Sequence, residues 1–245
     1  MNPRSFVIDT TPESVSKYRD THAIVAVDVF RATTVIVTAL AHGHPIYPVS
    51  TVAEATVVAT RLHNPLLAGE QAGIKPDGFD LNNSPAAIEQ LTDCRPIVLV
   101  TSAGTKLLSE ARGASSIYVA CLRNMIATAA QLIGTNRRVA LIGAGTHGEA
   151  RPEDQYACAR IAEMLHSQGY MPEDKRTVAE LAEWRGVGVQ TMRSSPSADF
   201  LRNTGQHDDL EFVLSRVDDI DASAVFNGQQ VSLMLPGAQR LLAEA

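Results

Sequence analysis

The sequence predicts an α/β protein: a layered α/β/α arrangement with a mainly parallel sheet and a helical C-terminal third. Short apolar runs alternate with segments of helical periodicity through the first two thirds of the chain. Several of these runs are continuous stretches of valine, isoleucine and leucine without polar alternation, as in strands that are covered on both faces. Strands of this kind alternating with helices are typical of a parallel sheet with helices on both sides.

Seven strands and five helices are expected before residue 145. The strands are predicted at Phe6–Ile8, Ala23–Val29, Ile46–Val49, Leu66–Ala68, Pro96–Thr101, Ser116–Ala120 and Arg138–Ile142. The helices between them are predicted at Ala32–Ala41, Val52–His63, Ala86–Leu91, Thr105–Ala111 and Met125–Leu132.

The pattern changes near residue 150, where helical segments follow one another without strands. Pro152 favours the start of a long amphipathic helix. With no internal repeat, low-complexity tract or long linker, residues 1–245 are expected to form one compact unit, and a division into two lobes near 145–150 is left open. Helices are predicted at Glu153–Ser167, Arg176–Trp184, Ser197–Asn203 and Asp208–Ser215, whereas Ala224–Phe226 and Val231–Leu235 are ambiguous.

The composition is ordinary for a globular enzyme. The hydrophobic fraction is 45% and the charged fraction 20%, which is unlike a disordered chain. A net charge of −6 disfavours the broad basic surface that nucleic acid or an anionic membrane requires. We therefore expect neither partner, whereas backbone amides and one arginine can still bind a small anion locally.

The cysteines and the N-terminus indicate a reduced, cytoplasmic compartment. Cys94, Cys121 and Cys158 are widely spaced and odd in number, so they indicate neither a metal site nor a disulfide framework. The N-terminus lacks the basic region and apolar stretch of a signal peptide, and no apolar stretch is long enough to span a membrane. A homodimer is expected only because such assemblies are common.

An anion site is indicated where the second strand meets its helix. Asp28 ends the strand, and Arg31, Thr33 and Thr34 stand at the helix start. Ligands of open α/β sheets bind outside the carboxyl ends of strands, where free N–H groups of a helix start attract anions. Arg31 and the two hydroxyls can donate to phosphate oxygens, and Asp28 suits Mg²⁺ or attack on phosphorus. The alternative is a structural Asp–Arg pair with a threonine helix cap.

A second acidic loop follows the fourth strand. Glu70 ends this strand and Gly73 lies in the loop, whereas Asp80, Asn83 and Ser84 belong to the turn before the next helix. Two carboxylates in one loop are candidates for metal ligands or for an acid–base pair. The alternative is plain turn chemistry, because these residue types dominate turns.

Two further strand-to-helix junctions are candidates for ligand binding. Ser102, Gly104 and Thr105 allow close approach to an anion, and an ordinary turn explains them equally well. Glu153 and Asp154 lie in a first helical turn, where acids are favoured by the helix dipole and can also reach a metal.

The segment from Gly143 to Gly148 has the pattern G-x-G-x-x-G after a strand, so a nicotinamide dinucleotide site has to be considered. Glu149 would face the pyrophosphate, and Pro152 opens the helix too late for this fingerprint. We therefore rank this site as the weaker alternative.

Taken together, these segments resemble the 2-phosphosulfolactate phosphatase family, Mg²⁺-dependent enzymes of the coenzyme M pathway. Residues 28–34 are similar to its D-V-[LF]-R-A-[TS]-[TS] segment, and residues 69–73 and 78–85 to its G-E-R-x-G and G-[FA]-D-x-G-N-S-P segments. Residues 102–105 fall where the family has T-T-N-G-T, and Gly145 with Glu153 and Asp154 falls where it has a P-A-G turn and an acidic pair. The resemblance covers about residues 5 to 230.

This chain departs from the family pattern at four positions. Gln71 stands where the family has arginine, Asn82 replaces a glycine, Ala103 replaces an asparagine, and Gly143 stands in place of a proline. Loss of the arginine removes a cation from the expected anion site, which bears on recognition of a sulfonate more than on phosphatase chemistry.

The resemblance implies Mg²⁺-dependent hydrolysis of the phosphate monoester of a small 2-hydroxy acid, as in 2-phospho-3-sulfolactate plus water giving 3-sulfolactate and phosphate. The implied catalytic residues are Asp28, Arg31, Glu70 and Asp80. Magnesium ligands would come from Asp28, Glu70, Asp80, Glu153 and Asp154. The implied substrate contacts are Thr33, Thr34, Gly73, Asn83, Ser84, Ser102, Gly104 and Thr105.

Three questions stay open at this level. Either Asp28 attacks phosphorus or a carboxylate activates a metal-bound water. The chain can also be a catalytically altered homologue that only binds a small anion, an alternative whose support is Gln71 and Ala103. A nicotinamide-dependent oxidoreductase is the third alternative.

Overall fold

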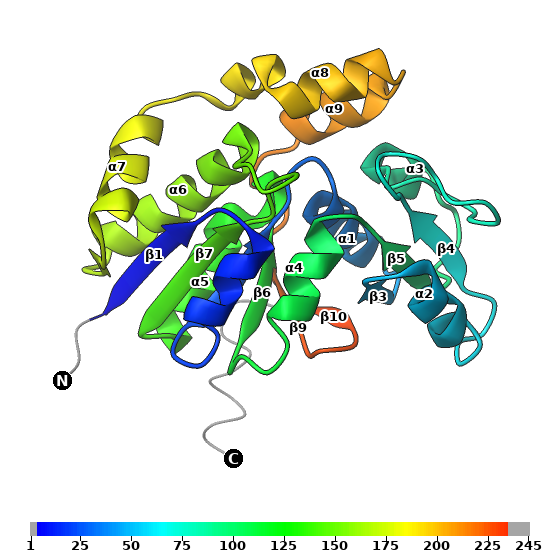
Figure 1. Ribbon diagram of the computed structural model, residues 1–245, viewed down its shortest axis with the longest axis horizontal. Coiled ribbons are helices and arrows are strands. Elements are labelled where there is room, and N and C mark those ends of the chain that lie inside the picture. Colours follow the sequence, from blue (N-terminus) through cyan, green and yellow to red (C-terminus); the bar gives the residue numbers. More distant parts are fainter. Residues whose placement is uncertain (1–3, 235–245) are drawn as a thin grey trace.

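The strands join into a 10-stranded sheet whose spatial order differs from their order in the chain (Figure 1). The computed structural model describes residues 4–234. Across the sheet the order is β4-β5-β3-β10-β9-β6-β2-β7-β1-β8. The strands are β1 Ser5–Asp9, β2 Ala23–Val27, β3 Ile46–Val49, β4 Leu66–Gly69, β5 Ile97–Val100, β6 Ile117–Ala120, β7 Arg138–Gly143, β8 Met171–Pro172, β9 Ser223–Phe226 and β10 Val231–Met234.

Helices connect these strands and dominate the chain after β7. The α-helices are α1 Ala32–Ala41, α2 Val52–Ala59, α3 Pro85–Glu89, α4 Gly104–Glu110, α5 Met125–Thr135, α6 Pro152–Ser167, α7 Lys175–Trp184, α8 Pro196–Asn203 and α9 His207–Ser215. Short 3₁₀ helices lie at η1 Pro12–Lys17, η2 Leu122–Asn124 and η3 Val189–Ser194.

The predicted mainly parallel sheet is confirmed. β1, β2, β6 and β7 are paired in parallel, as are β3, β4 and β5. All seven strands expected before residue 145 are present, and so are the helices between them. Whether the chain divides into two lobes near 145–150 stays a prediction.

Each central strand is apolar on both faces, which explains its continuous apolar run. In β2, Val25 belongs to a cluster with α5 and α6, whereas Ile24 and Ala26 belong to a second cluster with α1 and α4. Because successive side chains of a strand point to opposite faces, both sets must be apolar once helices cover both faces. A smaller cluster packs α2 against β3 and β5. The layered α/β/α arrangement is therefore confirmed.

The ambiguous tail forms a hairpin that enters the middle of the sheet. β9 pairs antiparallel with β6 and with β10, and β10 pairs antiparallel with β3. The hairpin therefore separates the parallel group β4-β5-β3 from the parallel group β6-β2-β7-β1. Leu235, the last residue of this predicted segment, lies outside the described residues.

Two element ends differ from the prediction in ways that bear on the site or on the turns. β2 ends at Val27, so Asp28 begins the following loop instead of ending the strand. The second helix stops at Ala59 and not at His63, because the chain then turns through Asn64 at φ +46° toward Pro65. The residue before a proline is disfavoured in helical geometry.

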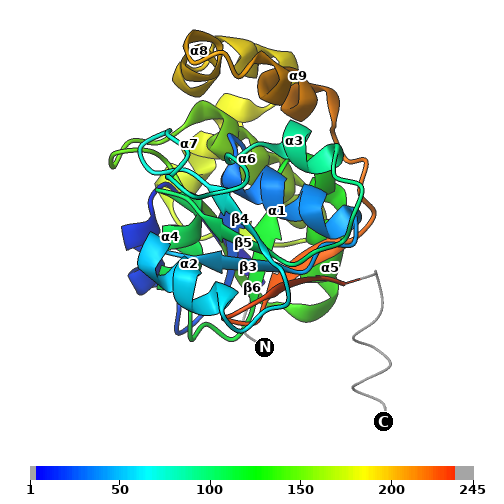
Figure 2. The ribbon, with the colours of Figure 1, turned by 90° about the vertical axis from the view of Figure 1, so that its right-hand side faces the viewer.

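The predicted helical C-terminal third is confirmed over α6 to α9, after which the chain returns to the sheet. In both views α8 and α9 lie beyond one end of the sheet (Figures 1 and 2). Over residues 4–234, none of the helices is both long and apolar enough to cross a membrane.

Candidate active site

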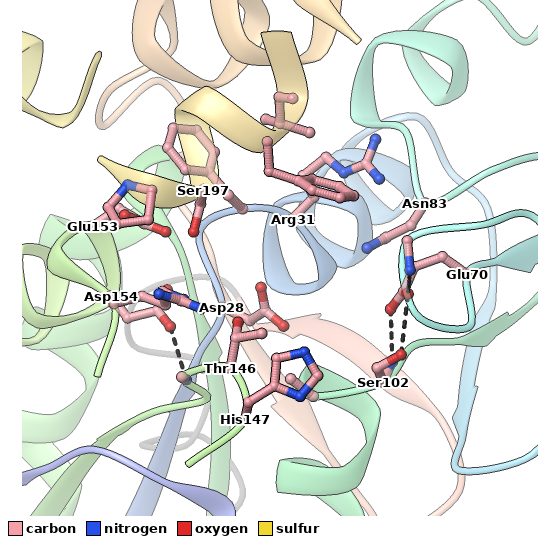
Figure 3. A pocket seen from close by; sticks show the side chains of 18 of the residues that line it. Asp28, Arg31, Glu70, Asn83, Ser102, Thr146, His147, Glu153, Asp154 and Ser197 are labelled. Carbon is pink, nitrogen blue, oxygen red and sulfur yellow. Dashed lines mark hydrogen bonds between the residues drawn. The ribbon is translucent and has the colours of Figure 1, made fainter. Parts of the chain in front are cut away.

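A cavity of about 510 Å³ opens at the carboxyl ends of the parallel strands. Its walls come from the loops after β2, β4, β5 and β7, and from α8 (Figure 3). Ligand sites of open α/β sheets lie in this position, where loops from neighbouring strands diverge. Of the residues expected to form the site, the cavity brings together Asp28, Arg31, Glu70, Gly73, Asn83, Ser102, Glu153 and Asp154.

Asp28 is held rigidly at the start of the loop after β2. Its backbone N–H donates to Thr33 Oγ1 at 2.9 Å, and its Oδ1 accepts from the Ala32 N–H at 3.3 Å. Burial, together with the negative charges of Glu70 and Glu153, raises the pKa of this carboxyl to about 7, although the Ala32 N–H and the charge of Arg31 act in the opposite direction. Asp28 is therefore a carboxylate whose charge is poorly compensated by the protein.

Arg31 lines the same cavity, but its guanidinium is already paired. Its Nη1 donates to Asp209 Oδ2 at 2.5 Å, and both side chains are buried. Arg31 can still donate to a phosphate, because a guanidinium carries five N–H groups in a planar fork. The structural pair that the sequence left open therefore exists, with Asp209 in place of Asp28.

Thr33, Thr34 and Thr105 do not line the cavity, contrary to expectation. The Thr33 and Thr34 hydroxyls donate to the carbonyls of Asp28 and Val29 at 2.8 Å each. The Thr105 hydroxyl donates in the same way to the Thr101 carbonyl at 2.7 Å. All three hydroxyls shape the strand-to-helix junctions, because a short polar side chain there competes for backbone groups.

Glu70 ties together the loops after β4 and β5. Its Oε1 accepts from the Ser102 N–H at 2.7 Å, and its Oε2 accepts from Ser102 Oγ at 3.0 Å and from the Gly73 N–H at 2.6 Å (Figure 3). Glu70 therefore organises this wall of the cavity and is itself part of the lining.

Asp80 lies outside the cavity, so the structure does not bring it together with the other residues that were expected to be catalytic or to bind metal. The segment after the loop folds back beside β4, where Ala68 and Leu81 form a bridge. The Asp80 Oδ2 accepts from the Leu67 N–H at 2.8 Å on the exposed side of this turn. Asp80 is thus a turn residue, as the plainer interpretation of this loop had it.

Of the turn residues that follow Asp80, Asn83 lines the cavity, whereas Ser84 caps a helix. Asn83 lines the cavity, is buried, and has no hydrogen-bond partner for its Oδ1 within the described chain. Ser84 caps α3, since its Oγ accepts from the Ala87 N–H at 3.0 Å, and it does not line the cavity. Gly104 does not line the cavity either, but it packs directly against Asp28 and Ala32.

Glu153 and Asp154 enter the cavity from the first turn of α6. Asp154 accepts from the Val29 N–H at 2.8 Å and from the Gly145 N–H at 3.2 Å, so it fixes the loops after β2 and β7. Burial, together with the charges of Asp28 and Glu153, raises the pKa of Asp154 well above its usual range. Burial also raises the pKa of Glu153, whose Oε2 has no partner within residues 4–234.

The sequence reasoning missed several residues of the cavity wall. His147, Arg151, Ser197 and Phe200 all line it. Arg151 directly precedes Pro152, so a search around the predicted helix start would have found it. Ser197 and Phe200 come from α8, and no local sequence signal places that helix over the strand ends.

The glycine pattern after β7 forms a tight turn that closes on itself. Thr146 and Glu149 exchange backbone hydrogen bonds of 2.9 and 3.0 Å. A side chain at Gly145, which has φ +60°, would fall 2.5 Å from the Glu149 carbonyl oxygen. The following helix presents two acids at its start, so its geometry does not favour a pyrophosphate.

Gln71 does not line this cavity. It is exposed and lines a second, smaller cavity of about 270 Å³, which reaches Lys106 and shares Glu70 and Ser102 with the first. The position where the family has arginine therefore does not contribute to the main cavity wall, whereas Arg151 and His147 do.

The acids of the cavity fit a hard cation. Asp28, Glu70, Glu153 and Asp154 share its walls, and Glu153 Oε2 is buried without a partner among the described residues. Within residues 4–234, no group of three or more His, Cys, Asp or Glu side chains is arranged so that it could hold a metal ion by itself. Magnesium needs no such cage, because it usually keeps several waters and binds one or two carboxylates together with substrate phosphate.

Comparison with known proteins finds one family model and several relatives, all with the same description. The family model of 2-phosphosulpholactate phosphatase matches residues 9–226. A probable 2-phosphosulfolactate phosphatase of Carboxydothermus hydrogenoformans is 36% identical over 191 residues, which cover 78% of this chain and 76% of the relative. Proteins of the same description from Pseudothermotoga lettingae and Clostridium botulinum are 37% and 28% identical, over 64% and 85% of this chain and 67% and 90% of their own lengths.

Proposed function

Since this chain belongs to the 2-phosphosulfolactate phosphatase family, we propose that it hydrolyses the phosphate monoester of a small 2-hydroxy acid in the cytoplasm, with Mg²⁺ as cofactor. The chain is a phosphoric monoester hydrolase, and 2-phosphosulfolactate is the first substrate to test. The observation that carries the proposal is the cavity in which Asp28, Glu153 and Asp154 meet Arg31 at the strand ends.

The substrate is anionic, whereas the cavity wall is rich in carboxylates that would repel it. The pKa values of Asp28 and Asp154 are raised by burial and by neighbouring carboxylates, so their negative charges lack compensation from the protein. A divalent cation held by Asp28 with Glu153 or Asp154 would supply that compensation. Bound there, Mg²⁺ would polarise the phosphoryl oxygens and neutralise the charge that develops on them.

Arg31 and Asn83 are placed to bind the phosphoryl group from the other side. Both are buried in the cavity wall, and in Figure 3 both lie across the cavity from Glu153. The Arg31 guanidinium matches two phosphate oxygens, and the Asn83 amide adds a neutral donor. Arg151 adds a second guanidinium to the cavity wall and His147 an imidazole, and these groups suit the carboxylate or sulfonate of the substrate.

The reaction forms a new bond to phosphorus and breaks its bond to the ester oxygen. The leaving oxygen takes up a proton and becomes the 2-hydroxyl group, while the phosphoryl group ends as inorganic phosphate. Asp28 either attacks phosphorus, giving an acyl phosphate that water then hydrolyses, or activates the attacking water. Trapping a phosphorylated Asp28 by rapid acid quench would identify the first route.

The test is phosphate release from 2-phosphosulfolactate and 2-phospholactate, with and without Mg²⁺, for the natural protein and Asp28→Asn. Release that needs Mg²⁺ and is lost in Asp28→Asn supports the proposal. Release from neither substrate would favour the binding-only homologue, and equal turnover by Asp28→Asn would show that the site is wrongly assigned.

A further inference from the structure

Building on the proposed phosphatase, we propose that Asp209 is a positioning residue: it holds the Arg31 guanidinium in the cavity wall, ready to bind the phosphoryl group. Asp209 itself does not line the cavity. It reaches the site only through Arg31, from a helix that is 178 residues away in the sequence.

The contact between the two side chains is short and shielded from water. Nη1 of Arg31 lies 2.5 Å from Oδ2 of Asp209, and the two side chains are 4% and 5% exposed. This is the one side-chain hydrogen bond of Arg31 among residues 4–234. Figure 3 shows the Arg31 side chain extending along the wall toward α3, so one edge of its guanidinium is fixed and its other N–H groups stay available.

The carboxylate of Asp209 is itself fixed by the start of α3. Its Oδ1 accepts from Ser84 Oγ at 2.6 Å and from the Ala86 N–H at 3.2 Å. Asp209 thus accepts from two segments besides its own helix α9: from Arg31 in the loop after β2, and from Ser84 and Ala86 at the start of α3. A carboxylate with both oxygens occupied cannot rotate freely, so it sets the direction in which the guanidinium lies.

Without the ion pair to Asp209, the Arg31 guanidinium can pair with other carboxylates. Arg31 lies close enough to Asp28 for its charge to lower the pKa of that carboxyl, and Glu70 shares the same cavity. Breaking a buried ion pair leaves the remaining charge uncompensated, so the free guanidinium will move toward one of these acids. The Arg31 guanidinium would then pair with a carboxylate that is proposed to bind the metal. It would no longer be placed to donate two hydrogen bonds to the phosphoryl oxygens.

Asp209→Asn distinguishes a role of Asp209 in orienting Arg31 from a role in folding alone. Asparagine is almost the same size and keeps an oxygen to accept from Ser84 and Ala86, but it can direct an NH₂ group at Arg31. The matched control is Asp208→Asn, which changes the exposed neighbouring aspartate on the same turn of α9. Both changes are made in the natural protein and in Arg31→Lys, which completes a double-mutant cycle.

Two measurements are made on each variant: kcat and KM for phosphate release, and the Kd for inorganic phosphate by calorimetry in the presence of Mg²⁺. We expect Asp209→Asn to lower kcat/KM by about 100-fold, as a misplaced binding group does. We also expect it to weaken phosphate binding. Asp208→Asn should match the natural protein, and Asp209→Asn should add little once Arg31 is lysine.

An unchanged phosphate affinity in Asp209→Asn would overturn the proposal, and so would tighter binding. Losses that simply add in the double variant would also overturn it, because they would show that Asp209 acts through folding and not through Arg31. If the natural protein hydrolyses none of the esters, the proposed function fails, whereas the phosphate titration still decides the role of Asp209.

Discussion

Gly104 stands directly behind the carboxylate of Asp28. A methyl group placed on Gly104 would lie 2.5 Å from Asp28 Oδ2 and 2.4 Å from the Ala32 side chain. The start of α4 thus approaches the loop after β2 so closely that only a glycine fits without displacing Asp28. This relationship allows the position of Asp28 to be tested without changing Asp28 itself.

Gly104→Ala should push the Asp28 carboxylate out of place and lower kcat/KM by about 100-fold, the cost of a misplaced reacting group. The control is Gly134→Ala, because a methyl group on that helical glycine meets nothing within 4 Å. Phosphate release and thermal melting are measured for both. Equal activity in Gly104→Ala and Gly134→Ala would show that the placement of Asp28 is not critical.

Asp28→Asn should abolish turnover and yet stabilise the metal-free protein. An unfolded aspartate has a pKa of about 3.9, whereas burial raises the pKa of folded Asp28 to about 7. Between these values the folded state holds a proton that the unfolded state has lost, so the stability contribution of Asp28 falls as the pH rises and then stays constant.

The melting temperature gained by Asp28→Asn over the natural protein should therefore be small at about pH 5 and largest at about pH 8. Melting curves in the presence of a chelator measure this difference. A gain that is equal at both pH values would mean that Asp28 has no raised pKa in the folded protein.

Magnesium binding should become stronger as the pH rises from about 6 to about 8 and should release protons. The cause is the raised pKa of Asp28, Glu153 and Asp154, because a cation competes with protons for the same oxygens. Calorimetric titration in two buffers of different ionisation enthalpy counts the protons released. Binding without proton release would place the metal elsewhere.

Arg151→Gln should raise the KM for 2-phosphosulfolactate by about 10-fold, more than the KM for 2-phospholactate, since it removes a cation from the cavity wall. Gln71→Arg, which introduces the arginine that the family has there, should change the ratio of the two KM values less. The reason is that Gln71 is exposed and lines the smaller cavity. A larger effect of Gln71→Arg would show that the two cavities act as one site.

The parts of the site that the sequence predicted are those that follow from strand ends. Asp28 and Glu70 come directly after parallel strands, and parallel strands bring their carboxyl ends to one edge of a sheet. Glu153 and Asp154 were found because Pro152 marks the start of α6.

Other parts of the site depend on pairings that no local pattern encodes. Asp80 was expected in the site, but its segment folds back beside β4, where its side chain accepts from the Leu67 N–H and does not line the cavity. Asp209 was missed because an aspartate near a helix start is ordinary, and only the folded chain brings it to Arg31. For the same reason the tail of the chain could not be assigned: β9 and β10 are short, and their place depends on the edges of β6 and β3.

The hairpin of β9 and β10 also has a consequence for the order of events during synthesis. A ribosome delivers the chain from residue 1 onward, so every catalytic loop emerges before residues 223–234 do. Until then, no strand of the group that carries Asp28 is hydrogen-bonded to a strand of the group that carries Glu70, within the described part of the chain. Emergence of β9 and β10 therefore supplies the hydrogen bonds that join the two groups of strands into one sheet.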